Sequence, residues 1–184
     1  TMQDDHRVDA VVLAGGDGTV VDPSVPVKGL IPVLGQQMVG WVVRALRDAK
    51  SVRHIVVVVP TAEGLEPWAD MVDELVISNG TFVENSVAGV ERLAGELPVL
   101  AVTGDVPAIT GQAIDDFVAR TQQAGATFSY ALISRDSMEQ QVPGSVRTYY
   151  KIDGAQHAGG NVIIGRFDPE NQSVRNLAQR FFDA

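Results

Sequence analysis

The stretch Val11-Val12-Leu13-Ala14-Gly15-Gly16-Asp17-Gly18-Thr19 decides the fold, because an apolar run ends in a cluster of glycines. Continuous apolar runs are typical of strands covered on both faces, and we predict one over residues 8–14. The glycines that follow carry no Cβ, so the main-chain N–H groups of the loop are open to a closely fitting ligand. A strand that ends in such a loop is suited to holding phosphate.

Lys28 adds a positive charge a short way downstream of the glycine cluster. An ammonium group on a flexible stem can act as a point charge beside phosphate. Together with the N–H groups of Gly15, Gly16 and Gly18, Lys28 predicts a site for a nucleoside triphosphate. Two plainer interpretations stay open, in which Lys28 is a solvated loop residue and Asp17 serves a turn.

Apolar runs of strand length alternate with helical patterns along the rest of the chain. We predict strands over 53–59, 74–77, 98–103, 128–133, 147–152 and 161–165, and helices over 38–50, 83–95, 110–124 and 169–184. This alternation indicates an α/β fold with a mostly parallel sheet. The length of 184 residues fits one domain over the whole chain, 1–184, and we expect residues 1–7 to be flexible.

Asp105 is the second chemical signal, because it directly follows the apolar run 98–103 in the segment Thr103-Gly104-Asp105-Val106-Pro107. Ligands of open α/β sheets bind at the carboxyl ends of strands. A single carboxylate there can hold Mg²⁺ together with substrate phosphates, since this ion keeps several waters and needs few protein ligands. The alternative is a plain turn, for which Gly-Asp-x-Pro is well suited.

The composition excludes several functional classes. The chain has no cysteine, so disulfides, thiolate catalysis and zinc–cysteine sites are excluded, and a reducing, cytoplasmic location is expected. Its net charge of −9 and the lack of a basic block argue against a nucleic-acid surface. No apolar run approaches the roughly 20 residues that span a bilayer, and no signal-peptide pattern is visible, so no membrane partner is expected.

Two runs in the first 38 residues resemble the opening of the nucleotidyltransferase superfamily: Val12-Leu13-Ala14-Gly15-Gly16-Asp17-Gly18-Thr19 and Lys28-x-Leu30-x-Pro32-x-x-Gly35-x-x-Met38. Three later segments resemble further motifs of that family. They are Glu84-Asn85-Ser86-Val87 for its base-contacting helix start, Gly104-Asp105-x-Pro107 for its metal aspartate, and Tyr150-Lys151-Ile152-Asp153-Gly154 with Ala158-Gly159-Gly160-Asn161-Val162 for the acceptor side of its MobA-like branch.

The resemblance implies a three-layer, Rossmann-like (GT-A-like) fold of the nucleotide-diphospho-sugar transferase type, with a mostly parallel mixed sheet. It implies Mg²⁺-dependent transfer of a nucleotidyl group from an NTP to a small phosphorylated acceptor, with loss of pyrophosphate. Lys28 and Asp105 are then the catalytic residues, and Asp105 also holds the metal. The nucleotide is expected at Leu13, Ala14, Gly15, Gly16, Gly18, Thr19, Asn85 and Ser86, and the acceptor at Gly159, Gly160 and Asn161.

The chain departs from the family pattern at two places. The family usually has an arginine just after the glycine loop, where it meets the triphosphate, whereas Val20 and Val21 follow Thr19 here. A second metal ligand is common late in such domains, Asp168 is the one nearby candidate, and the chain ends early for the family at Ala184. Simpler interpretations make Asn85-Ser86 a helix cap and Gly159-Gly160-Asn161 a bulge.

Three alternative functions stay open. The first is a catalytically degenerate relative that binds a nucleotide or a partner, which the missing arginine favours. The second is a dinucleotide-dependent oxidoreductase, which the spacing Gly15-Gly16-Asp17-Gly18 disfavours because it does not fit G-x-G-x-x-G. The third is a glycosyltransferase of related fold, for which an Asp-x-Asp metal motif is missing. The base and the oligomeric state stay undetermined at this level.

Overall fold

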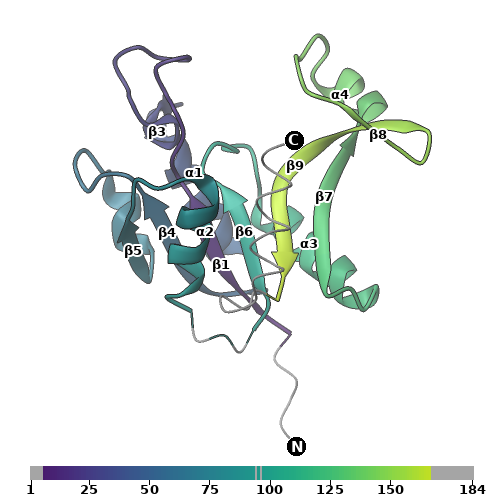
Figure 1. Ribbon diagram of the computed structural model, residues 1–184, viewed down its shortest axis with the longest axis horizontal. Helices are drawn as coiled ribbons and strands as arrows, with labels where there is room; N and C mark the ends of the chain where they lie inside the picture. Colours follow the sequence, from purple (N-terminus) through teal and green to yellow (C-terminus); the bar gives the residue numbers. More distant parts are fainter. Residues whose placement is uncertain (1–5, 94, 96, 167–184) are drawn as a thin grey trace, which may run out of the picture.

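A mixed seven-stranded sheet forms the centre of the computed structural model, which describes residues 6–93, 95 and 97–166 (Figure 1). The strands follow the order β5-β4-β1-β6-β9-β7, and β8 pairs with β9 outside this path. Their bounds are β1 Val8–Leu13, β4 Val52–Val59, β5 Glu74–Ile77, β6 Val99–Thr103, β7 Phe128–Ser134, β8 Tyr150–Ile152 and β9 Ala155–Gly165. A two-stranded ribbon, β2 Pro32–Val33 and β3 Gln36–Gln37, lies apart from this sheet.

The strands of the large sheet run mostly in one direction. β1, β4, β5 and β6 pair in parallel, and β9 is antiparallel to its neighbours β6, β7 and β8. The mixed, mostly parallel sheet expected from the sequence is therefore confirmed. The carboxyl ends of the four parallel strands meet at one edge, which we call the carboxyl edge.

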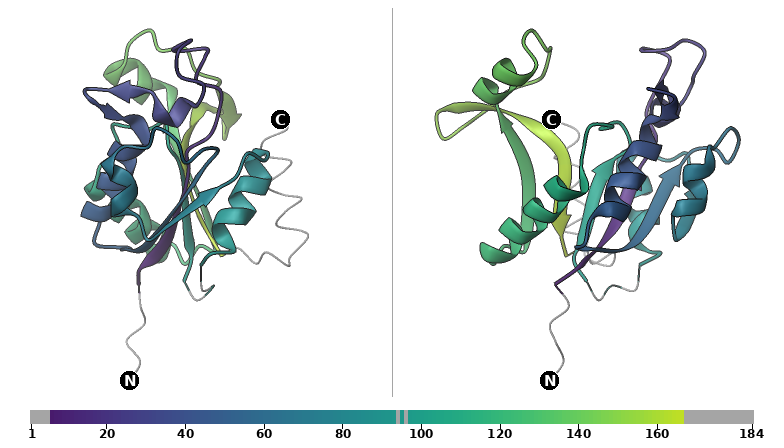
Figure 2. Two further views of the ribbon diagram at one scale, coloured as in Figure 1. Left: turned by 90° about the vertical axis from the view of Figure 1, so that its left-hand side faces the viewer. Right: turned by 180° about the vertical axis from the view of Figure 1, so that it is seen from behind.

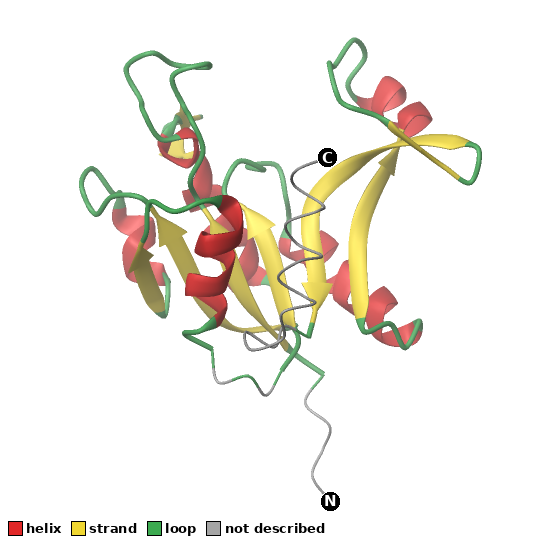
Figure 3. Cartoon of the chain, viewed as in Figure 1, coloured by secondary structure: helices red, strands yellow, loops and turns green. Residues whose placement is uncertain are grey.

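Helices cover both faces of the sheet and create three layers, as the edge-on view in Figure 2 shows. α1 (Met38–Asp48) and α3 (Gly111–Gln123) pack on one face, and α2 (Phe82–Val90) packs on the other (Figure 3). The alternation of side chains along β1 explains why both faces are apolar. Ala10 and Val12 join the core under α1 and α3, whereas Val11 and Leu13 join the core under α2.

The helix predictions on either side of the sheet differ in how well their ends were placed. In α1 the predicted apolar face is buried, with Val42 fully buried and Leu46 nearly so. α2 begins at Phe82, one residue earlier than predicted, because Thr81 and Glu84 form a reciprocal capping box. It ends at Val90 rather than at residue 95, because the N–H groups of Arg92 and Leu93 bond three residues back and tighten the last turn.

An arm made of α4 (Arg135–Gln141), β8 and the adjoining ends of β7 and β9 extends past the carboxyl edge (Figures 1 and 2). No sequence pattern indicated α4, because its seven residues are too few to reveal a helical period. The strand predicted over 147–152 shortens to β8, which pairs only with the first residues of β9 across the Asp153-Gly154 turn. The predicted helix 169–184 lies outside the described residues.

β9 begins at Ala155, well before the predicted start at residue 161. Gly159 and Gly160 interrupt the apolar pattern, so they indicated a break between elements. In the structure they lie within the strand, where the register against β7 shifts between the pairs Tyr130–Ile163 and Leu132–Gly159. The strand therefore continues through a bulge, as the simpler interpretation of these glycines allowed.

Candidate functional site

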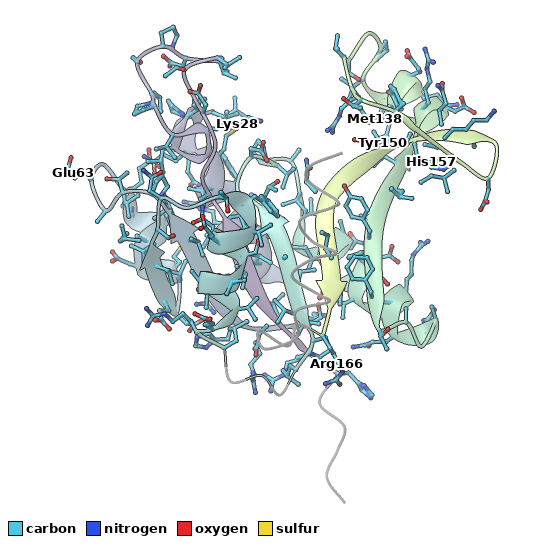
Figure 4. The ribbon with its side chains drawn as sticks, viewed as in Figure 1. Lys28, Glu63, Met138, Tyr150, His157 and Arg166 are labelled. Carbon is cyan, nitrogen blue, oxygen red and sulfur yellow. The ribbon has the colours of Figure 1, made fainter. Side chains whose placement is uncertain are left out.

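Lys28 and Asp105 meet at the carboxyl edge, although 77 positions separate them in the sequence. Lys28 Nζ lies 2.5 Å from Asp105 Oδ2, and the side chains are 40% and 23% exposed, respectively. Lys28 opens the short 3-10 helix η1 (Lys28–Leu30), and Asp105 lies two residues after β6. Figure 4 labels Lys28 at the end of the molecule opposite Arg166, on the same side as the arm residues Tyr150 and His157.

Two glycines bring this lysine and this aspartate together. Gly29 and Gly104 both pack against Ala14, which directly follows β1. A Cβ on Gly29 would lie 2.9 Å from the Ala14 oxygen, and one on Gly104 would lie 2.9 Å from Ala14 Cα. The Gly104 N–H also donates to the Leu13 oxygen over 2.8 Å. Each glycine is the sequence neighbour of a charged residue, so their packing on Ala14 fixes the approach of Lys28 to Asp105.

Asp105 is held as a carboxylate. Burial raises its pKa, but the hydrogen bond from Lys28, the nearby Thr103 hydroxyl and the Lys28 charge outweigh burial, so the pKa of Asp105 lies below its ordinary value. Asp105 Oδ1 and Thr103 Oγ1 are both buried and make no hydrogen bond of normal geometry among the described residues. The Thr103 hydroxyl therefore acts on Asp105 by proximity, and the carboxylate keeps an unused acceptor oxygen.

The glycine loop folds back on the segment that carries Lys28. The Lys28 N–H donates to the Gly16 oxygen over 2.9 Å, and Gly16 adopts a φ of +87°, which a glycine tolerates without strain. Within the described part of the chain, the N–H groups of Gly15 and Gly16 have no acceptor. A Cβ added to Gly15 would meet no atom within 4 Å. The space on the Cβ side of Gly15 is therefore open, and Gly16 lies beside the Lys28 stem, because a Cβ added there would lie 3.7 Å from Lys28 Cβ.

Gly18 and Thr19, two of the predicted nucleotide-binding residues, form hydrogen bonds within the glycine loop itself. The Gly18 N–H donates to the Pro26 oxygen over 3.0 Å, so it does not join the open N–H groups of Gly15 and Gly16. The Thr19 N–H and hydroxyl both donate to Asp17 Oδ1, over 2.9 and 2.6 Å. This bond lowers the pKa of the Asp17 carboxyl. The turn interpretation of Asp17 is confirmed, and the loop itself uses the polar groups of Thr19.

The main chain at the end of β1 is also largely engaged. The Leu13 oxygen accepts from Gly104, and the Ala14 N–H donates to the Val58 oxygen over 2.8 Å. Only the Ala14 oxygen, beside Gly29, makes no hydrogen bond among the described residues. Of the two residues predicted to meet the base through their main chain, Ala14 is thus the better placed, and Leu13 contributes its side chain to a pocket.

Asn85 and Ser86 lie inside α2 and bond within their own segment. Asn85 Oδ1 accepts from the Ser78 hydroxyl and from the Gly80 N–H, and Asn85 Nδ2 donates to the Gly80 oxygen. The Ser86 hydroxyl donates to the Phe82 oxygen, one turn earlier. Asn85 therefore shapes the loop before α2 instead of offering free polar groups to a base. The simpler prediction that these residues cap the helix is wrong, because Thr81 is the N-cap.

A small pocket on the α2 side of the sheet connects the end of β6 with β7 and β9. Its lining residues are Leu13, Phe82, Ala101, Val102, Thr103, Tyr130, Asn161 and Ile163. Asn161 follows the glycines of the β9 bulge with a φ of +59°, and its side-chain amide has no partner among the described residues. The predicted acceptor segment and the strand end before Asp105 therefore share one pocket.

Gly159 and Gly160 precede Asn161 in β9 and pack closely against β7. A Cβ on Gly159 would meet the Tyr130 hydroxyl, and a Cβ on Gly160 would lie 3.0 Å from the Ala131 oxygen. Burial and the neighbouring Tyr150 raise the pKa of the Tyr130 phenol. Tyr130 and Phe82 were not predicted as site residues, because single aromatic residues carry no motif. They come together at the pocket only in the folded chain, Tyr130 from β7 and Phe82 from α2.

The described residues offer a cation few further ligands. Over 6–93, 95 and 97–166, no group of three or more His, Cys, Asp or Glu side chains could enclose a metal ion. Asp168 lies outside the described residues.

Val20 and Val21, which stand in place of the expected arginine, are 84% and 64% exposed. Among the described helices, none is long and apolar enough to cross a membrane.

Comparison with known proteins identifies the family of this chain. The family model of the MobA-like NTP transferase domain matches residues 10–167. The bifunctional protein GlmU of Synechococcus sp. (strain RCC307) is 34% identical over 122 residues, which cover 62% of this chain and 26% of GlmU. The 2-C-methyl-D-erythritol 4-phosphate cytidylyltransferase of Saccharopolyspora erythraea is 32% identical over 125 residues, which cover 64% of this chain and 55% of that enzyme. The matched part of the chain thus spans about a quarter of the length of GlmU and about half of the length of the cytidylyltransferase.

Solved structures agree with this comparison. A hypothetical transferase from Thermus thermophilus superposes with a TM-score of 0.74 at 29% identity, over 95% of this chain and 71% of that one. The synthetase for CMP-2-keto-3-deoxy-manno-octonic acid, solved with CTP, shares the fold with a TM-score of 0.61 at 13% identity. The fold therefore belongs to the Rossmann-like nucleotide-diphospho-sugar transferase class. Within that class, the chain belongs to the MobA-like NTP transferase domain family.

Proposed function

We propose that the protein is a Mg²⁺-dependent nucleotidyltransferase, which moves an NMP group from an NTP to a small phosphorylated acceptor and releases pyrophosphate. The observation that carries this proposal is the meeting of Lys28 and Asp105 at 2.5 Å, beside the open N–H groups of Gly15 and Gly16. Main-chain N–H groups, an ammonium and a carboxylate are the groups that a triphosphate and its cation require. Family membership and the names of the relatives support the same reaction class.

Asp105 fits a magnesium ion by its chemistry. Its lowered pKa keeps the carboxylate charged near neutral pH, and its side chain is 23% exposed, so a cation from solvent can reach it. Because no further acidic cluster lies among the described residues, Asp105 would hold the ion together with phosphate oxygens and water, as Mg²⁺ sites often do. When bound, the ion supplies charge neutralisation for the phosphates and for the departing pyrophosphate.

The remaining chemistry falls to positioning by the chain. The N–H groups of Gly15 and Gly16 bind phosphate oxygens, and Lys28 neutralises charge on the α-phosphate. A phosphate oxygen of the acceptor attacks the α-phosphorus and forms a new P–O bond. The bond from the α-phosphorus to its bridging oxygen breaks, and pyrophosphate leaves with that electron pair. No covalent intermediate with the protein is required, so orientation and electrostatics carry the rate.

The acceptor is assigned to the pocket that Asn161 lines. Its lining combines apolar side chains with Thr103, Tyr130 and Asn161, so an acceptor with a hydroxyl-bearing or polar body would find hydrogen-bond partners there. The pocket adjoins the end of β6, from which Asp105 follows. An acceptor bound there would direct its phosphate toward the group held by Lys28.

Pyrophosphate release tests the reaction. The protein is incubated with each of the four NTPs, Mg²⁺ and a panel of sugar phosphates and polyol phosphates. We expect release that depends on one NTP and on one class of acceptor. A degenerate nucleotide binder is the second candidate, favoured by the exposed Val20 in place of an arginine. Tight NTP binding without release for any acceptor would establish that candidate and exclude the transferase.

A further inference from the structure

We infer that Lys28 and the divalent cation are alternative partners of the same carboxylate oxygen of Asp105. The cation then binds Asp105 only when a triphosphate is present to take over the Lys28 ammonium. This inference rests on the proposed function and adds to it an order of binding, in which the triphosphate enters before the cation or together with it.

The first argument concerns which oxygen a cation can reach. Lys28 Nζ occupies Oδ2, whereas Oδ1 is buried. The Asp105 side chain is still 23% exposed, so solvent reaches it on the side that includes Oδ2. A hydrated cation that arrives from solvent therefore meets the oxygen that already accepts from Lys28.

The second argument concerns the cost of the exchange. A hydrogen bond between an ammonium and a carboxylate is stronger than one between neutral groups. A cation that displaced Lys28 without a phosphate nearby would leave the ammonium without an acceptor and beside a like charge, which raises the free energy of the complex. A triphosphate removes both penalties, because its oxygens accept from Lys28 and its charge offsets the two cations.

The third argument is that Lys28 can make this exchange by side-chain rotation. Its stem passes beside Gly16, where an added Cβ would lie 3.7 Å from Lys28 Cβ and 4.0 Å from Lys28 Cδ. Gly16, whose N–H has no acceptor among the described residues, therefore lies beside this stem, and Gly15 directly precedes it in the glycine loop. Rotation of the Lys28 side chain can therefore bring its ammonium to a phosphate bound at the N–H groups of Gly15 and Gly16. The Lys28 N–H stays bonded to the Gly16 oxygen during this rotation.

The test measures binding of Mn²⁺, as a magnetic substitute for Mg²⁺, by the loss of the free-ion electron paramagnetic resonance signal. In the absence of nucleotide, we expect Lys28→Gln to bind Mn²⁺ about tenfold more tightly than the wild type, because the competing ammonium is gone. Lys28→Met, which keeps the apolar stem, should behave alike and serves as the second variant. Lys50→Gln removes one positive charge from an exposed position elsewhere and should change Mn²⁺ affinity little.

The outcomes separate this inference from the proposed function. The order of binding is overturned if the Lys28 variants and the wild type bind Mn²⁺ equally, while Asp105→Asn weakens both; the metal site of the proposed function then stands. If inorganic tripolyphosphate also fails to produce Mn²⁺ binding that depends on Asp105, the metal assignment itself is wrong. Support requires two results: tighter Mn²⁺ binding by both Lys28 variants alone, and restoration of wild-type Mn²⁺ binding by tripolyphosphate.

Discussion

At the residue scale, the site depends on what a few positions lack. Gly15 and Gly16 lack a Cβ, Oδ1 of Asp105 lacks a hydrogen-bond partner, and Val20 lacks a charge. Lys28 and Asp105 could be predicted as site residues from the sequence alone, because a glycine loop and an aspartate at a strand end are recognisable sequence patterns. The sequence did not reveal that the Gly18 N–H bonds to the Pro26 oxygen, because that bond depends on how the chain returns at the far side of the loop.

Gly15→Ala separates phosphate binding from stability. The added methyl group meets no protein atom within 4 Å, and the backbone of Gly15 is not in the left-handed region, so stability should change by less than about 0.5 kcal/mol. The methyl group would, however, enter the space beside the open N–H groups. We therefore expect NTP affinity, measured by isothermal titration, to fall at least severalfold. Unchanged affinity would show that phosphate does not approach Gly15.

Val20→Arg tests whether the missing guanidinium limits nucleotide affinity. Val20 is 84% exposed, so the replacement removes little packing. An arginine there can form charge-assisted hydrogen bonds to phosphate, and we expect NTP affinity to rise about tenfold. Val21→Arg adds the same charge at the neighbouring, 64% exposed position and is the matched control. Equal gains from both variants would indicate a change in net charge rather than a specific contact.

The lowered pKa of Asp105 gives the Lys28–Asp105 pair a pH signature. A carboxylate whose folded pKa lies below its unfolded value stabilises the protein above the unfolded pKa, near 3.8, and loses that contribution as the pH falls through the folded pKa. The wild type should therefore be more stable than Asp105→Asn at pH 7, and this advantage should shrink at a pH below 3.8, as the pH falls through the lower folded pKa. Urea unfolding of both proteins at the two pH values measures it, and an advantage that persists in acid would contradict it.

At the element scale, the sequence predicted most strands and the α1 and α3 helices, because their apolar periods are long and uninterrupted. It failed where neighbours decide the structure. The bulge in β9 depends on pairing with β7, and the short α4 depends on the Ser134 cap and on packing against β7 and β9. The sequence indicated a turn at Gly104 and made no prediction for Gly29, whereas in the structure both glycines let η1 and the β6 end approach Ala14 closely.

Gly104→Ala tests this convergence of elements. Its Cβ would lie 2.9 Å from Ala14 Cα and 3.0 Å from Ala14 Cβ, so backbone must shift. We expect a loss of about 1–3 kcal/mol in the free energy of unfolding. Because the shift displaces Asp105 from the phosphates expected at Gly15 and Gly16, the Mn²⁺ affinity in the presence of tripolyphosphate should also fall. Gly15→Ala, which meets no atom, is the control, and equal stability of the two variants would contradict the close approach.

At the scale of the whole molecule, the mostly parallel sheet creates the site. Four strands of one direction bring their carboxyl ends to one edge, and β9, which runs in the opposite direction, has the predicted acceptor segment at the same edge. The net charge of −9 repels a polyphosphate at long range, so binding depends on local groups and on a cation. The alternation of strands and helices predicted a sheet whose strands end at a common carboxyl edge. The composition of β9 did not indicate that this strand runs in the opposite direction.

The dependence on a cation predicts how nucleotide binding stabilises the molecule. A ligand that binds only the folded state at about 100 times its dissociation constant adds about 2.7 kcal/mol, which corresponds to a rise of roughly 5–10 °C in Tm for a chain of this size. We expect this rise with the preferred NTP and Mg²⁺ together, and a much smaller one with NTP and excess EDTA, because the acidic chain then faces uncompensated phosphates. Asp105→Ala should abolish the difference between the two conditions, measured by differential scanning fluorimetry. If Asp105→Ala retains the full Mg²⁺-dependent rise, the cation is bound elsewhere and Asp105 is a turn residue.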